Sequence, residues 1–105
     1  MKGNFTNLEI GYLASNLAPE MVVRVNKEGN VSLKHMSNPG VQFVLYRHDD
    51  GIIIRRRIKS KCPQGAGHIL NNGKGFLSVE GATAYFKQYM AKYPKNLVQS
   101  YNIKW

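Results

Sequence analysis

The residues best suited to bind an anion stand in one short run, Arg55-Arg56-Arg57-Ile58-Lys59-Ser60-Lys61. In a β-strand alternate side chains point to the same side, so half of this run would form a row with a spacing of about 6.8 Å. That row consists of Arg55, Arg57, Lys59 and Lys61. The spacing is close to that of successive phosphates along a nucleic-acid strand. Arginine also suits phosphate, because its planar guanidinium donates two hydrogen bonds at once. The run therefore predicts a surface that binds a phosphate backbone.

Four further residues extend this predicted nucleic-acid site. Tyr46 is expected beside the arginines of the same hairpin, where its ring can stack on a base or pack under a guanidinium. Lys74 stands between two glycines and would lengthen the row of phosphate contacts. His48, at the end of a strand, and Lys87, on the outer face of a helix, are secondary candidates. With duplex DNA as the favoured partner, six phosphate contacts would give a slope of log K against log salt of about −5.

The charge of the chain is divided unevenly between its two halves. Residues 1–50 hold five basic and five acidic groups, whereas residues 51–105 hold ten basic groups and one acid, Glu80, so the whole net charge of +9 lies in the second half. This asymmetry indicates an anionic partner. Two other interpretations stay open. One is an interaction module or inhibitor, of the type that phages and mobile elements encode, whose basic surface binds an acidic protein; the other is a solvated basic edge strand that resists aggregation.

Residues with the chemistry of catalysis or metal binding show no recognisable spacing. The candidates His35, His48, His68 and Cys62 form no pair typical of a zinc site, and the glycine-rich stretch lacks the lysine and hydroxyl pair of a phosphate-binding loop. We therefore expect no metal, no cofactor and no enzyme activity. A small ribonuclease, in which His48 or His68 would transfer protons, remains a second alternative.

The chain carries no sequence signal for a membrane or for secretion. It has no run of 18 apolar residues, its first residues lack the apolar stretch of a signal peptide, and its one cysteine, Cys62, cannot form an internal disulfide. We therefore expect a cytoplasmic protein without a membrane partner. A length of 105 residues fits one domain, 1–105.

The first half of the chain predicts one helix and two hairpins. Thr6 and Glu9 have the spacing of a capping box, and apolar residues recur with helical spacing until Pro19, which predicts a helix over 7–18. Strands are expected over 21–25, 31–36, 41–48 and 52–59. With Asp50-Gly51 as the loop of the second hairpin, Tyr46 would face Arg55 and Val44 would face Arg57. The apolar side of this hairpin would carry Val41, Phe43, Leu45, Ile52, Ile54 and Ile58.

The second half predicts a long glycine-rich loop, a helix and a last strand. Residues 60–75 contain four glycines, with a short strand expected at 68–70. Ser78 is a suitable N-cap for a helix that Pro94 ends, and alternation over 97–105 predicts a strand. The fold class that follows is α+β, a largely antiparallel sheet of two hairpins and a C-terminal strand, packed by two amphipathic helices.

Overall fold

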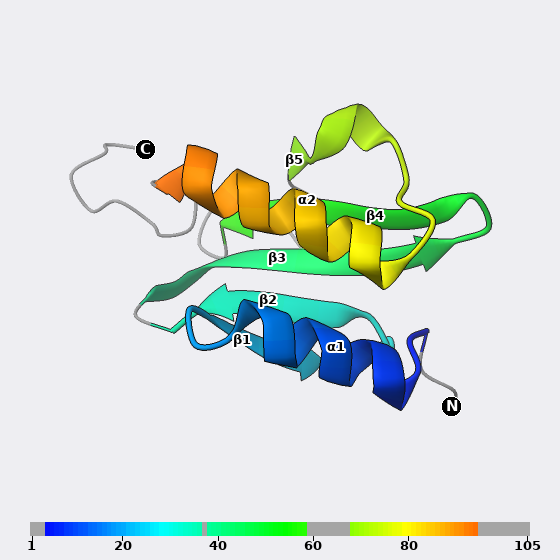
Figure 1. Cartoon of the computed structure of the whole chain (residues 1–105), viewed down its shortest axis with the longest axis horizontal. Coiled ribbons are helices and arrows are strands. Elements are labelled where there is room, and N and C mark those ends of the chain that lie inside the picture. Colours follow the sequence, from blue (N-terminus) through cyan, green and yellow to red (C-terminus); the bar gives the residue numbers. More distant parts are fainter. Residues whose placement is uncertain (1–3, 37, 59–67, 95–105) are drawn as a thin grey trace.

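A computed structural model describes residues 4–36, 38–58 and 68–94 (Figure 1). Its strands form one antiparallel sheet in chain order, in which each strand pairs with the next. The elements are α1 (Asn7–Leu17), β1 (Met21–Val25), β2 (Val31–His35), β3 (Asn38–His48), β4 (Gly51–Ile58), β5 (His68–Ile69), the 3-10 turn η1 (Asn71–Gly73) and α2 (Val79–Lys92). The predicted α+β class is confirmed, and the strand expected over 97–105 lies outside the described residues.

Both helices begin at the caps that the sequence indicates. In α1 the Glu9 amide donates to Thr6 Oγ1 at 3.1 Å, and the Thr6 amide donates back to Glu9 Oε1 at 2.9 Å, which completes the capping box. In α2 the Gly81 amide donates to Ser78 Oγ at 3.2 Å. These bonds satisfy amides that would otherwise lack a partner in the first turn of each helix.

The two helices lie on the same face of the sheet and enclose the core with it (Figure 1). At the centre, the buried ring of Phe43 on β3 meets Phe86 of α2 edge to face, with the ring centroids 4.9 Å apart. Leu13 and Leu17 bring α1 into the same cluster. Val41, Leu45, Ile52 and Ile54 are also buried there, as the apolar side of the hairpin predicts. The helices therefore cover one face of the sheet, and the side chains that point to the opposite face are not covered by either helix.

The predicted register of the β3–β4 hairpin is wrong by two residues. Tyr46 pairs with Ile53, Val44 with Arg55 and Gln42 with Arg57, because the turn is Asp49-Asp50 and Gly51 already pairs with His48. A shift of two residues keeps every side chain on its predicted side of the sheet. The distribution of residues between the two faces is therefore as expected, although the facing pairs differ.

The first residue of β4 is a glycine, Gly51, and two segments of backbone lie in contact at this point. Its φ of +138° disfavours residues with a side chain, and a Cβ there would lie 3.0 Å from the carbonyl carbon of Gly75. A Cβ on Gly75 would lie 2.9 Å from the carbonyl oxygen of Asp50. Next to this contact, the amides of Ile52 and Phe76 donate to each other's carbonyls at 2.8 and 2.9 Å. The segment before α2 is thus tied directly to the end of the hairpin.

Candidate functional site

The sheet face that carries neither helix is called the basic face here. By register and alternation it consists of Val22, Arg24, Ser32, Lys34, Gln42, Val44, Tyr46, His48, Ile53, Arg55, Arg57 and Ile69. Four of these strand positions are basic and none is acidic. The face therefore combines positive charge with one tyrosine. The sequence predicts this combination for the β3–β4 hairpin, and the structure adds Arg24 and Lys34 from β1 and β2.

Arg55 and Tyr46 contact each other on this face. The Arg55 Cζ atom lies 5.5 Å from the centroid of the Tyr46 ring, so the guanidinium packs over the ring. The exposed His48 ring lies beside the same tyrosine, nearly parallel to it, with centroids 6.3 Å apart. The Nε atom of Arg55 is buried and has no hydrogen-bond partner among the described residues. Tyr46 thus orients the guanidinium, which forms no ion pair with a carboxylate among the described residues.

Arg57 belongs to a chain of hydrogen bonds that crosses three strands. Its Nη1 donates to Gln42 Oε1 at 2.6 Å, and Gln42 Nε2 donates to Ser32 Oγ at 2.7 Å. Because Arg57 lies on β4, Gln42 on β3 and Ser32 on β2, the chain fixes these side chains relative to one another. The basic face is therefore organised before any ligand binds.

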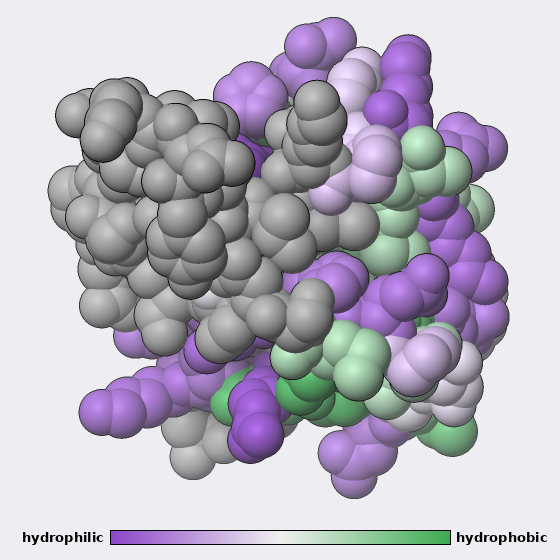
Figure 2. Space-filling model, turned by 90° about the vertical axis from the view of Figure 1, so that its left-hand side faces the viewer, coloured by the Kyte–Doolittle hydropathy of each residue, from purple (hydrophilic) through white to green (hydrophobic). Residues whose placement is uncertain are grey.

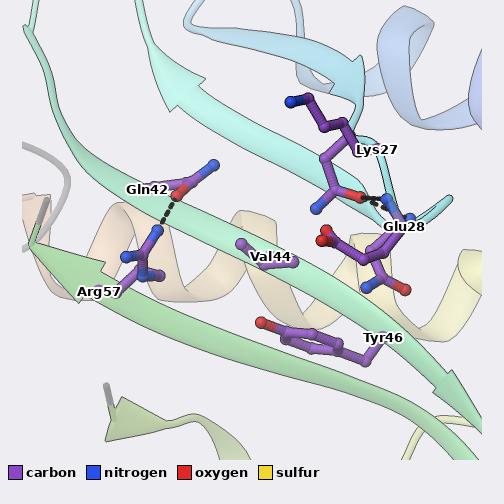
Figure 3. A pocket seen from close by; sticks show the side chains of 8 residues that line it. Lys27, Glu28, Gln42, Val44, Tyr46 and Arg57 are labelled. Atoms are coloured by element: carbon purple, nitrogen blue, oxygen red, sulfur yellow. Dashed lines mark hydrogen bonds between the residues drawn. The ribbon is translucent and has the colours of Figure 1, made fainter. Parts of the chain in front are cut away.

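A hollow of about 430 Å³ lies between these hydrogen-bonded side chains and the β1–β2 turn. Its lining includes the turn residues Asn26, Lys27, Glu28 and Asn30 and the strand residues Gln42, Val44, Tyr46 and Arg57. Figure 3 shows Glu28 reaching from the turn toward β3, and Tyr46 and Arg57 lying on the side nearer β4. Volumes of 300–1,000 Å³ with a few polar groups are usual for small-molecule sites.

The turn that walls the hollow is braced by three asparagines. Asn26 Oδ1 accepts hydrogen bonds from the amides of Glu28 and Asn30, each at 3.0 Å. Asn4 adds a bond from its Nδ2 to Asn30 Oδ1 at 2.7 Å, and Gly29 supplies the positive φ of +83° that the turn requires. The wall is therefore a rigid part of the fold rather than a loose connection.

The structure separates the remaining predicted site residues. Lys74 is exposed just after η1, beside Gly73, which lines a second hollow with Arg55 and His48. Lys87 is exposed on α2, so the sheet lies between it and Arg55. Lys59 and Lys61 lie outside the described residues. Tyr46, Arg55, Arg57 and His48 are thus brought together on one face, whereas Lys87 is on the other side of the molecule.

The histidines of the ribonuclease alternative do not share a face. His48 lies on the basic face, whereas His68 pairs with Arg56, on the side of the helices. Within residues 4–36, 38–58 and 68–94 no group of three or more histidine, cysteine, aspartate or glutamate side chains is placed to hold a metal ion. In the same ranges no helix is long and apolar enough to cross a membrane.

Arg47, on the helix side of the same hairpin, forms an ion pair with α1. Its two terminal nitrogens donate to the two carboxylate oxygens of Glu9 at 3.2 and 2.8 Å, and its Cζ lies 4.8 Å from the centroid of the Phe5 ring. The hydrogen bond from Arg47 lowers the pKa of Glu9, and the backbone hydrogen bond from Thr6 acts in the same direction. Arg47 therefore joins β3 to α1.

Sequence reasoning missed the residues of the turn. Lys27, Glu28 and Asn30 were expected only to connect two strands, yet they form one wall of the hollow. The asparagines at 26 and 30 were the available signal, because asparagine side chains often bond to nearby backbone in structured turns.

Comparison of the chain with protein-family models, with curated proteins and with solved structures gave no match. Function must therefore be inferred from the chain itself. On the side of the molecule shown in Figure 2, the visible described residues are mostly hydrophilic, and the hydrophobic ones form small areas. Charge and hydrogen bonding are accordingly the properties from which we infer a partner.

Proposed function

We propose that this protein binds nucleic acid through the basic face of its sheet. The observation that carries the proposal is the position of Arg55, which lies on a face with three further basic strand residues and packs over Tyr46. Within the described residues its guanidinium has no carboxylate partner, in contrast to Arg47. Arginine next to an aromatic ring is the combination that contacts a phosphate and a base together.

The roles of the residues follow from their positions. Arg55 and Arg57 bind phosphates, and Lys74, next to the second hollow, would extend the contact along the backbone. Alternation in the sequence assigns Lys59 and Lys61, which lie outside the described residues, to the same row. Tyr46 orients Arg55 and stacks on a base, with His48 beside it. Because the basic residues would contact phosphates and release their counterions, we expect binding that depends strongly on salt.

The test is a fluorescence-anisotropy titration of labelled DNA and RNA at two salt concentrations, with wild type, Arg55→Gln and Lys92→Gln. Lys92 is the control, because it is exposed near the end of α2 on the other side of the molecule. Arg55→Gln should weaken binding about tenfold and lower the salt slope by about 0.7 to 0.9, the value for one phosphate contact. Lys92→Gln should change neither quantity by a comparable amount.

Two results would contradict the proposal. Wild-type protein that binds no nucleic acid at low salt would direct the search to an acidic protein partner. Equal losses in Arg55→Gln and Lys92→Gln would show that binding follows total charge and not the basic face.

A further inference from the structure

The hollow beside the β1–β2 turn contains a carboxylate, and binding to the phosphate backbone of a nucleic acid does not explain this group. Glu28 lines the hollow, and within the described residues its carboxylate has neither a hydrogen bond nor an ion pair. A carboxylate repels phosphate, so a surface that contacted the backbone alone would be weakened by it. The group is better suited to accept hydrogen bonds from the edge of a base.

Asn30 supplies a donor on the same wall of the hollow. Its Oδ1 accepts from Asn4 and its main-chain amide donates to Asn26, while its Nδ2 has no partner among the described residues. Asn30 is only 9% exposed, so its amide group is held in place. Asn30 and Glu28 thus present a fixed donor and an acceptor two residues apart in the chain.

We infer that the hollow receives one unpaired guanine of a single-stranded nucleic acid, an inference that rests on the proposed function. Guanine carries an oxygen acceptor next to two N–H donors along one edge. The carboxylate of Glu28 accepts from both donors, and Asn30 Nδ2 donates to the oxygen. Thymine and uracil have a single N–H between two oxygens, so one of those oxygens would face the carboxylate.

Two features of the fold favour a single strand over the duplex DNA expected from the sequence. A base inside a duplex has its edge paired and its faces stacked, and cannot enter a hollow whose floor is Val44, a side chain only 3% exposed. The tip of the β3–β4 hairpin is Asp49-Asp50, so a hairpin inserted into a groove would bring two carboxylates toward the phosphates. The basic face therefore fits a strand with accessible bases.

The test compares thymidine strands of about 15 nucleotides, a length that covers one site of a small domain. One strand is all thymine, and the others carry a central guanine, adenine or cytosine. The set is repeated with uridine RNA and with duplexes of the same sequences. Anisotropy titrations use wild type, Glu28→Gln and the control Glu20→Gln, which removes an exposed carboxylate in the turn after α1.

Wild type and Glu20→Gln should bind the guanine strand about tenfold more tightly than the all-thymine strand, the usual discrimination of one bidentate contact. Glu28→Gln should lose this preference and still bind the thymine strand. Equal affinity of wild type for all strands, or tighter binding of the duplexes, would overturn the inference and leave the proposed function standing. If nothing binds at low salt, the proposed function fails as well.

Discussion

Two arginines of the β3–β4 hairpin, Arg47 and Arg55, have opposite surroundings. Arg47 points to the helix side, where its guanidinium makes two hydrogen bonds to Glu9 and packs on Phe5. Arg55 points to the basic face, where its guanidinium packs over the ring of Tyr46. The same residue type thus joins two elements in one place, and in the other lies over a tyrosine with no ion pair among the described residues.

Tyr46 provides a test of stacking. We expect Tyr46→Ala to weaken binding of a single strand by about 1–3 kcal/mol, because a base loses its aromatic contact and Arg55 loses the ring that orients it. Tyr46→Phe keeps the ring and should bind almost as wild type does. Anisotropy titrations of the three proteins measure this, and equal weakening by both substitutions would point to the hydroxyl instead of the ring.

The Glu9–Arg47 pair predicts a dependence of stability on pH. The pKa of Glu9 is below its ordinary value of 4.5 in the folded protein, so the unfolded chain takes up this proton at higher pH. The stabilisation is therefore present above about pH 4.5 and is lost as the pH falls through the lowered pKa. In thermal melts, Glu9→Gln should lower Tm at pH 7 and by less at about pH 3. An equal difference at both pH values would contradict this role.

At the scale of elements, the contact between the hairpin and the segment before α2 depends on glycine. Gly75→Ala should destabilise the fold by about 1–3 kcal/mol, because the added Cβ would lie 2.9 Å from the Asp50 carbonyl oxygen. Gly11→Ala in α1 is the matched control, since nothing lies within 4 Å of its Cβ position, and it should stabilise by about 0.5–1 kcal/mol. Urea denaturation measures both, and an unchanged Gly75→Ala midpoint would refute the constraint.

The elements were largely predictable from local signals, whereas their contacts were not. The Thr6–Glu9 spacing, the alternation along β3 and Pro94 depend only on neighbours in the chain, and they placed the helices and strands within a few residues. The predicted hairpin register failed because Asp50-Gly51 was taken as the loop, whereas Gly51 pairs with His48 and its backbone also approaches Gly75, a contact that neighbours in the chain do not indicate. The hollow also escaped prediction, because it needs β2 beside β3 and a turn that Asn4 braces from outside the hairpin.

At the scale of the whole molecule, the sheet separates two kinds of surface. One face is covered by α1 and α2 and supplies the core, and the other carries Arg24, Lys34, Arg55 and Arg57. The acids Glu9 and Glu80 belong to the helices, and Asp49 and Asp50 to the tip of the hairpin. Arg24 and Lys34 come from the half of the chain whose charges cancel, so the fold gathers basic residues from both halves of the chain on one face.

The most direct measurement is NMR chemical-shift mapping of labelled protein with a single-stranded oligonucleotide. The side-chain amide signals of Gln42 and Asn30 report on the hollow, and backbone amides report on each element. We predict the largest changes at these side chains and along β3 and β4, with small changes in α1 and α2. Changes concentrated in the helices, or none at low salt, would contradict a nucleic-acid site on the basic face.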